Sequence, residues 1–483
     1  MLSKSQSLIQ SWENINYCHW KSNEHLMEGL LGDTDLDVLV DENDKEKAEA
    51  ALKKCGYMQC RSQYGSRYPG VDDWIGFDEK TGKLIHIHLH YHIVTGHKGM
   101  KEYNLPWTQR TLETRIKDQE TGVYIMEPNL EIVTLYTRIG LKASVKRLKM
   151  AKAGKFVLGE DDLREINYLK KRIDLSKVHS ILEEYYGKHT DEMLKIMEQD
   201  TIDSQNFVRL SKTASAAFAK CRRNNGFVCT LKKYYYIIAM RVISFVRHRM
   251  QKNIITRKTN INGKGCVIAF IGQDGAGKST VTSDIVKWLT WKLDAKKFYL
   301  GSGEHYHSWQ KKWHSKLPKK KNAITAALGA WLILSDYVAL AKNVQKTIIK
   351  AEKYAAKGGI AVFDRYPQNQ FIGINDGAKI RTLYVPKIKN KLIRKYALSR
   401  AKKEEQYIAK AVSHFPQLVI KLILPPEVSL QRKPEENIDI VRRKHEVIKS
   451  LAFEQSEVHT IDATMPYEEE IVKIKELIWQ KIQ

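Results

Sequence analysis

One stretch, residues 266–280, limits what this chain can fold into more than any other. It reads CVIAFIGQDGAGKST, in which six apolar or small residues lead into Gly272, four further residues, and then Gly277, Lys278 and Ser279. The apolar run predicts a strand buried on both faces, and apolar residues recur at helical spacing after it. A strand, a glycine-rich loop and a helix in this order are typical of a loop that binds phosphate groups.

The residue types in this loop follow from what a phosphate group needs. Glycines leave backbone N–H groups uncovered and permit positive φ, and the start of a helix carries partial positive charge. We expect the phosphates of a nucleotide cofactor to be bound by Gly272, Gly275, Ala276, Gly277, Lys278, Ser279 and Thr280. Lys278 should reach the β- and γ-phosphates, and the hydroxyl of Ser279 should bind Mg²⁺.

Composition sets wider limits. A length of 483 residues predicts two or three domains. The formal net charge of +26 indicates polyanionic partners such as nucleotides, nucleic acid or anionic lipid. Six cysteines are scattered without a CxxC pair, which favours reduced thiols in a cytosolic protein. The first residues lack an apolar core of signal-peptide length, so we expect a cytoplasmic location.

Two apolar stretches are candidates for membrane spans. Residues 234–246 are too few to cross a bilayer. Residues 323–341 contain one charge, Asp336, and have borderline length. Because the second stretch lies between the glycine-rich loop and a later strand of the same predicted fold, we expect a buried core helix there.

The first segment, residues 1–125, has chemistry of its own. Asp35 and Asp37 begin a predicted strand and lie on one face of it, where two carboxylates can hold Mg²⁺. This segment resembles the nucleotidyltransferase superfamily, which places an Asp-x-Asp pair at a strand start. His19-Trp20-Lys21-Ser22 stands where that superfamily has a Gly-Ser pair, with Lys21 replacing the glycine. The resemblance implies an α+β domain.

That superfamily also has a third carboxylate on a later strand. The strand predicted over residues 84–94 instead has a histidine at every second position, at His86, His88, His90 and His92. Alternation places all four on one face, and we expect His88 to complete a metal site with the two aspartates, because imidazole suits transition metals. The alternative is a half-exposed strand with polar residues outward. Asp73 and Asp78 are the nearby acids that can replace the missing carboxylate.

Residues 126–260 form a helical region that ends in a basic linker. Helices are predicted at 161–172, 175–186 and 191–199. Between Ser211 and Gly265 there are 13 Lys or Arg and no Asp or Glu. Region 211–265 therefore suits an anionic membrane surface or nucleic acid. The interpretation we favour is that its aromatic residues pack between the domains while the charges stay solvated.

The last segment, residues 264–483, alternates strands and helices, which predicts an α/β domain with a parallel sheet and helices on both faces. Strands are predicted at 359–363, 418–424 and 458–463. The first of these ends in Asp364-Arg365-Tyr366. An acid at the carboxyl end of a parallel strand faces the ligand crevice, so Asp364 is expected to bind Mg²⁺ or the acceptor, and Arg365 an acceptor phosphate.

These residues resemble the thymidylate kinase family of P-loop nucleoside monophosphate kinases. The resemblance covers roughly 215 residues and rests on the loop at 272–280, Asp364-Arg365-Tyr366, Pro425-Pro426-Glu427 with Arg432 behind it, and Ile461-Asp462-Ala463. It implies ATP, Mg²⁺ and a basic lid. It also implies that Asp274 is directed at the acceptor and that Arg432 clamps phosphate. The predicted catalytic residues are Lys278, Asp364, Arg365, Arg432 and Asp274.

Two departures from the family bear on the acceptor. Residues 299–305 replace its Arg-Glu-Pro-Gly-Gly segment, and Gln368-Asn369-Gln370-Phe371 replaces the residues that read thymine. We therefore expect an ATP- and Mg²⁺-dependent phosphotransferase acting on another nucleotide or on a sugar, polyol or glycan, similar to kinase-like proteins of bacterial surface-polysaccharide metabolism. One alternative is a nucleotide-gated binding protein that uses region 211–265. Another is a two-step enzyme that adds nucleotidyl transfer by the first domain.

Overall fold

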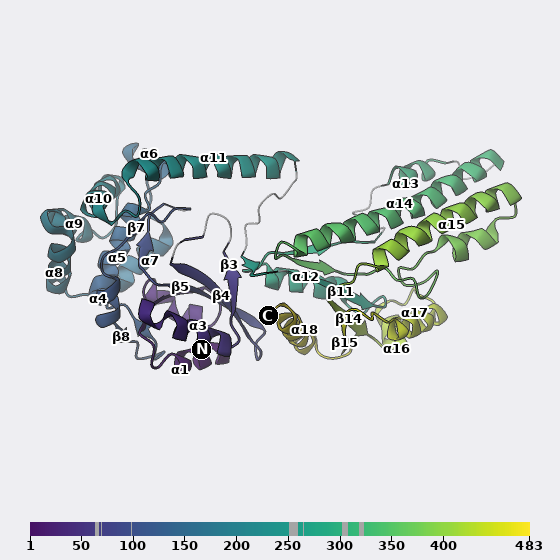
Figure 1. Cartoon of the computed structure of the whole chain (residues 1–483), viewed down its shortest axis with the longest axis horizontal. Coiled ribbons are helices and arrows are strands. Elements are labelled where there is room, and N and C mark those ends of the chain that lie inside the picture. Colours follow the sequence, from purple (N-terminus) through teal and green to yellow (C-terminus); the bar gives the residue numbers. More distant parts are fainter. Residues whose placement is uncertain are drawn as a thin grey trace. The chain divides into compact units, whose positions relative to one another are not determined.

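The computed structural model describes residues 1–62, 67–68, 70–97, 99–250, 259–263, 265–301, 308–317 and 323–483. The chain divides into two compact units, unit 1 (Met1–Thr259) and unit 2 (Asn260–Gln483). Both combine helices with β-sheet, which confirms the predicted α/β class. Figure 1 colours unit 1 from purple to teal and unit 2 from green to yellow. The predicted boundary at residue 125 falls within unit 1 and stays a prediction.

Unit 1 is built around a mixed sheet. Its strands are β1 (Tyr17–His19), β2 (Asp35–Val40), β3 (Met58–Arg61), β4 (Val71–Asp78), β5 (Lys83–His90), β6 (Val94–Thr95), β7 (Tyr103–Asn104), β8 (Ile116–Lys117) and β9 (Tyr124–Ile125). The main sheet has the order β3-β4-β5-β2-β1-β9-β8 within this unit. Strands β2 and β5 are parallel, with Asp35 beside His86 and Asp37 beside His88, and antiparallel β4 places Asp73 opposite His88. Three strands therefore bring polar side chains to one place.

Helices before, between and after these strands complete unit 1. They are α1 (Ser3–Ser11), α2 (Leu26–Leu30), α3 (Lys45–Lys54), α4 (Thr108–Glu113), α5 (Pro128–Leu141), α6 (Val145–Lys152), α7 (Glu160–Lys170), α8 (Leu175–Tyr186), α9 (Thr190–Met197), α10 (Ser204–Ala217) and α11 (Gly226–Met250). Helix α5 begins where the carboxylate of Glu127 accepts from the N–H of Leu130 at 3.0 Å, with Pro128 in the first turn. It is buried along almost its whole length, because the other helices and the sheet pack around it.

Unit 2 contains the predicted parallel sheet. After the short strand β10 (Asn260–Ile261), its strands are β11 (Cys266–Gly272), β12 (Ala295–Phe298), β13 (Ile360–Phe363), β14 (Leu418–Ile423) and β15 (Glu457–Asp462). The order is β12-β13-β11-β14-β15, and every neighbouring pair is parallel. Val267 and Ala269 are buried on one face, and Ile268 and Phe270 on the other. Both faces are therefore covered, as a parallel sheet requires.

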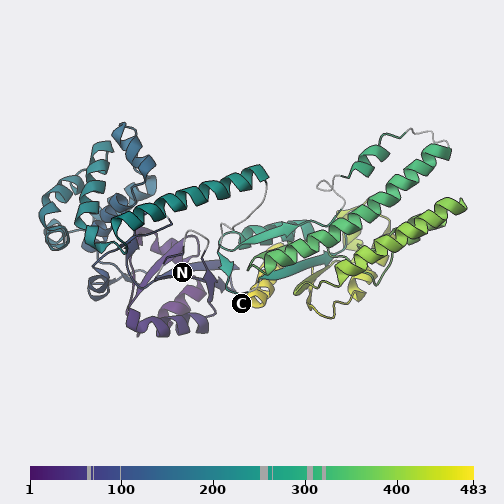
Figure 2. The ribbon, with the colours of Figure 1, turned by 45° about the horizontal axis from the view of Figure 1, so that its top comes forward.

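The helices of unit 2 are α12 (Lys278–Leu289), α13 (Trp309–His314), α14 (Ala323–Ala355), α15 (Lys391–Val412), α16 (Pro426–Arg432), α17 (Ile438–Ser450) and α18 (Tyr467–Ile482). Helices α14 and α15 lie side by side and extend beyond the sheet of their unit (Figures 1 and 2). The break between α16 and α17 contains Pro434, which cannot donate a helical hydrogen bond.

Helix α14 answers the membrane-span question in part. Among the described residues, one helix, at Ile324–Ala355, is long and apolar enough to cross a membrane by length and composition. Its C-terminal half packs into the core of unit 2 through Val344, Ile348 and Ala351. In its N-terminal half Ile324 is 78% exposed and Leu328 is 43% exposed. Within the predicted stretch, residues 323–341, Leu334 and Ala341 are buried, so the predicted core helix is correct for only part of that stretch.

Candidate functional site

The glycine loop, residues 272–279, joins β11 to α12 at the carboxyl edge of the sheet. Gly275 and Gly277 have φ of 81° and 79°, a region that residues with a Cβ rarely adopt. Gly272 has a different role, because a Cβ there would lie 2.7 Å from the carbonyl oxygen of Leu422 on the neighbouring strand. Two of the glycines thus shape the loop, and the third permits strand packing. Helix α12 begins at Lys278, so its first N–H groups face this loop.

Lys278 closes the loop on itself. Its ammonium group donates to the carbonyl oxygen of Gln273 at 2.7 Å. Burial lowers the pKa of Lys278 to about 8, although the nearby Asp274 carboxylate opposes that change. Ala276 is buried, whereas Ser279 and Thr280 are exposed at the start of α12. The hydroxyl of Ser279 is therefore accessible to a ligand that reaches the helix N-terminus.

Asp274 and Arg432 both anchor the loop to the helices behind it. A carboxylate oxygen of Asp274 accepts from the Lys444 ammonium at 2.5 Å. Burial opposes ionisation of Asp274, but this contact prevails and lowers its pKa. Arg432 donates to the carbonyl oxygens of Gly275 at 3.1 Å and Ala463 at 3.2 Å. In this structure the predicted clamp residue thus holds the backbone of the glycine loop.

Asp364 lies at the end of β13, beside β11, as predicted. Its residue is 5% exposed, and the carboxylate oxygen Oδ1 is buried with no hydrogen-bond partner among the described residues. The other oxygen lies 3.7 Å from the Lys297 ammonium. Lys278 is near enough to Asp364 to interact with it electrostatically. A buried carboxylate oxygen without a donor is costly, so this atom marks a place where a cation or a donor belongs.

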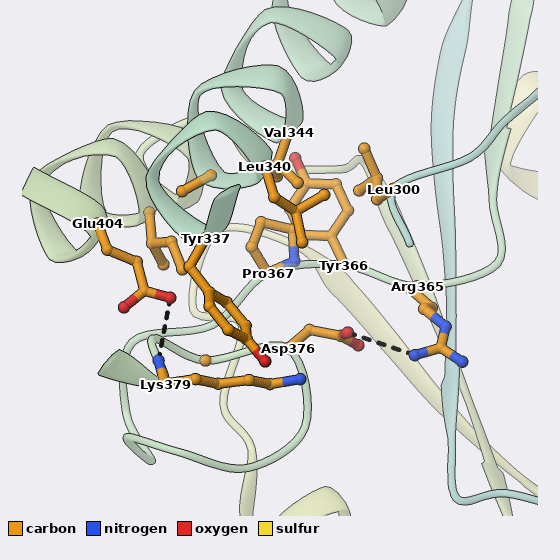
Figure 3. A pocket seen from close by; sticks show the side chains of 13 residues that line it. Leu300, Tyr337, Leu340, Val344, Arg365, Tyr366, Pro367, Asp376, Lys379 and Glu404 are labelled. Carbon is orange, nitrogen blue, oxygen red and sulfur yellow. Dashed lines mark hydrogen bonds and ion pairs between the residues drawn. The ribbon is translucent and has the colours of Figure 1, made fainter. Parts of the chain in front are cut away.

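A pocket opens next to Asp364. Its lining residues come from the segments before and after β13 and from α14 and α15: Leu300, Tyr337, Leu340, Ala341, Val344, Arg365, Tyr366, Pro367, Asp376, Gly377, Lys379, Glu404 and Ile408. Figure 3 shows Arg365 meeting Asp376 on one side, where their charged groups are 3.5 Å apart. The Asp376 carboxylate is the main cause that raises the pKa of Arg365. The pocket thus combines an apolar wall with charged groups.

Gln368 shapes one side of this pocket. Its side-chain amide donates to the carbonyl oxygens of Phe371 at 2.8 Å and Ile374 at 2.7 Å, and it accepts from the N–H of Phe371 at 2.8 Å. The residue is 1% exposed. These bonds fix the loop that presents Asp376. Residues 302–305 of the segment that departs from the family pattern lie outside the described residues.

Several side chains of this site escaped the sequence argument. Lys444 contacts Asp274 from 170 positions away, and Asp376 faces Arg365 from a loop without a motif. Lys297 stands on β12, whose pattern predicted no strand. Strand β12 reads Ala-Lys-Lys-Phe, and its two adjacent lysines break the alternation that would have marked a strand.

Unit 1 contains a second polar cluster, the histidine–aspartate cluster, formed by Asp35, Asp37, Asp73, His86 and His88. His86 lies between two carboxylates, with Nδ1 2.9 Å from Asp35 and Nε2 2.9 Å from Asp73. His88 does the same, with Nε2 3.1 Å from Asp73 and Nδ1 3.4 Å from Asp37. Ligand atoms of Asp35, His86 and His88 lie within 4.8 Å of one another. The predicted metal residues Asp35 and His88 are thus brought together with His86.

The negative charge of Asp37 is balanced by side chains of the same unit. The Lys21 ammonium lies 2.8 Å from its carboxylate, and His90 Nε2 lies 3.2 Å away. Burial opposes ionisation of Asp37, yet Lys21 and the histidines lower its pKa well below the usual range. Burial also lowers the pKa of His90 to about 3, so that ring is neutral at pH 7. Lys21, the residue that departs from the superfamily pattern, therefore supplies a built-in cation.

Two other candidates lie outside this cluster. Strand β5 ends at His90, so the prediction that His92 shares its face is wrong. The His92 ring is partly exposed and lies 4.0 Å from the carboxylate of Glu42. Asp78 instead accepts from Ser3 and Thr81 and closes a turn. Asp73 is therefore the third acid of the cluster.

Helix α11 has a row of exposed apolar side chains in unit 1. Its large apolar side chains at every third or fourth position are more than half exposed: Phe227, Leu231, Tyr234, Ile238, Val242 and Phe245. This spacing places them along one side of the helix. On the other side, Lys233 lies 2.8 Å from His97. Within unit 1 these six side chains are therefore left uncovered, and their packing between the domains stays a prediction.

Two proteins of Escherichia coli strain K12 are similar to part of this chain. The "Uncharacterized ATP-binding protein YghR" is 26% identical over 216 residues, which cover 42% of this chain and 82% of that protein. The "Uncharacterized ATP-binding protein YghS" is 27% identical over 222 residues, with coverage of 42% and 88%. No family model matches the chain. Both names describe ATP binding without a reaction.

Proposed function

We propose that unit 2 is an ATP- and Mg²⁺-dependent phosphotransferase, a thymidylate kinase-like P-loop kinase. The observation that supports this most strongly is the unpartnered, buried oxygen of Asp364 beside the glycine loop. It stands where an ordered Mg²⁺ ion or its water would supply the missing contact. The similarity to two proteins named for ATP binding supports the nucleotide assignment.

The residues of the glycine loop and of the neighbouring strand have separate roles in the proposed phosphoryl transfer. The N–H groups of the glycine loop and the Lys278 ammonium bind and orient the β- and γ-phosphates, in place of the contact that Lys278 now makes with Gln273. Ser279 and Asp364 fit a magnesium ion, which neutralises charge on the phosphates when bound. Arg365 and Arg432 add positive charge near the transferring group, where such charge contributes on the order of 10³ in rate.

The pocket beside Asp364 is the proposed acceptor site. Arg365 is suited to a phosphate or carboxylate, and Asp376 and Glu404 can accept from hydroxyl groups. Leu340 and Val344 cover an apolar part of the acceptor. We propose a nucleotide other than thymidylate, or a sugar, polyol or glycan unit of surface-polysaccharide metabolism.

Transfer of label from γ-labelled ATP tests this function. The native protein and Lys278→Ala are incubated with Mg²⁺ and a panel of nucleoside monophosphates, nucleosides, sugars and polyols. Label transferred to one class by the native protein alone would establish the kinase and name its acceptor. ATP binding without transfer to any acceptor would favour a nucleotide-gated binding protein instead.

We propose a second activity, nucleotidyl transfer, for unit 1. It is favoured by Asp73, a third carboxylate that is linked to Asp35 through the His86 ring and to Asp37 through the His88 ring. A chain with both activities would activate its substrate in two steps. Pyrophosphate release from nucleoside triphosphates tests it: Asp35→Asn should abolish release and leave transfer by unit 2 intact. Release that persists in Asp35→Asn would contradict the assignment.

We propose further that α11 binds anionic membrane surfaces. Its exposed apolar stripe, in a region with 13 basic and no acidic residues, has the composition of an interfacial helix. Co-sedimentation with vesicles of anionic or neutral lipid tests this, and Phe245→Ser should weaken binding to the anionic vesicles alone. Preferential binding to nucleic acid, with no vesicle binding, would contradict it.

A further inference from the structure

The exposed tryptophans of this chain lie together. The sequence has ten tryptophans, and all of them belong to the part of the chain that the structure describes. Seven are buried or half-buried, whereas Trp309, Trp313 and Trp331 are 55%, 61% and 39% exposed. These three lie on α13 and on the first half of α14. Because large aromatic side chains gain much from burial, three exposed ones in one region indicate a contact surface.

Helices α13 and α14 join their exposed side chains into one surface. We call it the apolar tip, and its residues are Trp309, Trp313, Ile324, Leu328 and Trp331. The spacing within each helix places its members on one face. The rings of Trp309 and Trp331 lie 6.0 Å apart between centroids, which connects the two faces. Figure 1 shows α13 beside the part of α14 that extends beyond the sheet.

Helices α14 and α15 run in the same direction. Leu334 packs in one apolar cluster with Ala397, and Ala341 packs in another with Ile408. The second half of α14 reaches the core of the sheet, so its first half lies at the outer end of the pair. The start of α15 lies at the same end.

The sequence around the apolar tip is strongly basic. Residues 308–335 contain six lysines and no Asp or Glu. Residues 385–403, which lead into α15 and form its first half, contain eight Lys or Arg and again no Asp or Glu. Such a surface attracts an anionic partner, and two copies of it repel each other. A second copy of this chain is therefore a poor occupant.

An anionic membrane surface fits both properties of the tip. Tryptophans are enriched where proteins meet the bilayer interface, and basic residues add attraction to anionic lipid. The exposed part of α14, from Ile324 to Trp331, is eight residues long, or about 12 Å of helix. The hydrocarbon core of a bilayer is about 30 Å thick. The tip therefore suits the interface of one leaflet and not a crossing.

The proposed acceptor pocket lies on the same helix as the tip. Tyr337, Leu340 and Val344 of α14 line the pocket. Tyr337 follows Trp331 by six residues, which is about 9 Å along the helix. When the tip rests in the interface, a lipid head group can reach the charged side of the pocket at Arg365 while its apolar tail stays in the bilayer.

We propose that the apolar tip docks unit 2 on an anionic membrane and that the acceptor is the head group of a lipid in that membrane. The acceptor assignment rests on the phosphotransferase function proposed above. An oxygen of the head group forms a bond to the γ-phosphorus of ATP, and the bond from this phosphorus to the bridging oxygen of the β-phosphate breaks. ADP leaves, and the proton of a hydroxyl acceptor passes to water.

Tryptophan quenching by lipid tests the docking. Vesicles whose acyl chains contain bromine quench tryptophans that reach the bilayer. We expect the full chain to be quenched by anionic brominated vesicles, hardly by neutral ones, and less in high salt. At saturating lipid, Phe245→Ser on α11 should keep this quenching, because the exposed tryptophans are not on α11.

Co-sedimentation measures which side chains bind the vesicles. Trp313→Gln and Ile324→Gln should each weaken binding to anionic vesicles about 10-fold, since each removes one large apolar side chain from the interface. Both positions are exposed, so the variants should fold. The matched control is Ile440→Gln, an exposed position on α17 outside the tip, which should bind like the native protein.

Label transfer to acceptors in vesicles tests the second half of the proposal. The probes are diacylglycerol, a long-chain prenol and a glycosylated diacylglycerol in anionic vesicles, each beside a short-chain soluble counterpart. We expect transfer to one of these lipids, about 10-fold lower in Trp313→Gln, and unchanged transfer to its soluble counterpart. Lys278→Ala should lose both transfers and keep the quenching, so failure of the kinase and failure of the docking are distinguishable.

Three results would overturn parts of this proposal. Absence of quenching by anionic vesicles would remove the docking, and a dimer that Trp313→Gln dissociates would assign the tip to a second copy. Transfer that is equal in Trp313→Gln and native protein for the lipid and its soluble counterpart would remove the lipid acceptor. Absence of transfer to any acceptor would remove the acceptor assignment together with the kinase, and quenching would still decide the docking.

Discussion

The buried carboxylates of unit 1 and unit 2 stand in opposite electrostatic surroundings. In unit 1, Asp37 and Asp73 are contacted by Lys21 and by histidines of the same sheet. In unit 2, Asp364 keeps one oxygen without a partner among the described residues, although cationic side chains lie nearby. One oxygen of Asp364 is thus left for a contact from outside the described residues, whereas Asp37 and Asp73 are already contacted by side chains of their own unit.

The two sheets explain this difference. All five strands of the parallel sheet in unit 2 end at one edge, so Asp364 and the glycine loop meet outside the sheet, where a large ligand fits. In unit 1 antiparallel β4 lies next to the parallel pair β2 and β5. Its polar residues therefore meet on the face of the sheet, within strands, where neighbouring side chains contact one another directly.

The largest expected effect is the loss of phosphoryl transfer in Lys278→Ala. Removal of the ammonium group that contacts the γ-phosphate should lower single-turnover transfer roughly 10³-fold. The exposed Lys287 at the end of the same helix is the matched control. An equal loss in Lys287→Ala would contradict the role given to Lys278.

Asp364→Asn should separate activity from stability. The substitution keeps the shape but removes a buried charge that has one unpartnered oxygen, so the unfolding temperature should stay the same or rise. Transfer should fall about 10²-fold or more, because the metal-ordering charge is lost. Thermal unfolding and turnover are measured together, with the exposed Asp439→Asn as control. A marked drop in unfolding temperature would mean that Asp364 is structural.

The features that could be predicted from the sequence are those encoded by adjacent residues. The glycine loop, the strands at 266, 360 and 418 and the acid after β13 all follow from local patterns. The contacts of Asp274 with Lys444 and of Arg365 with Asp376 could not be predicted, because tertiary packing alone brings these residues together. The same reason explains α14, whose apolar sequence does not reveal which half the core covers.

In unit 1 the strand register was the feature that could not be predicted from the sequence. Asp73 and Asp78 precede the same histidine strand, and only the antiparallel register places Asp73 opposite His88. Alternation correctly grouped His86, His88 and His90, but it could not show that the strand ends before His92. A period of two says which residues share a face, and not how far the strand continues.

Glu131 in unit 1 shows what burial does without a compensating cation. Burial, together with the nearby Glu165, raises its pKa from 4.5 to about 8. The folded state therefore keeps a proton that the unfolded state releases, so the free energy of unfolding should fall as pH rises from about 4.5 to 8, by at most about 1.4 kcal/mol per pH unit.

Glu131→Gln should remove this pH dependence. A glutamine is neutral like the protonated acid, and its Oε1 can still accept one of the two hydrogen bonds that Asn23 donates to Glu131. Denaturant unfolding between pH 5 and 9 measures the slope, with the exposed Glu198→Gln as control. An unchanged slope in Glu131→Gln would show that other groups titrate in this range.

The smallest expected effect concerns the ion pair of Asp274 and Lys444, in which unit 2 supplies its own cation to a carboxylate. Asp274 and Lys444 are each about one quarter exposed and 2.5 Å apart, so a double-mutant cycle of Asp274→Asn and Lys444→Met should give a coupling of about 0.5–1 kcal/mol that shrinks in high salt. The pair Arg442 and Glu427, 3.6 Å apart and more than half exposed, should give almost none. Equal coupling in both pairs would mean that Lys444 does not hold the glycine loop. A stronger coupling between Asp274 and Lys444 would make this ion pair comparable to the contact of Lys21 with Asp37 in unit 1. It would also predict that a nucleotide must break the ion pair before it binds.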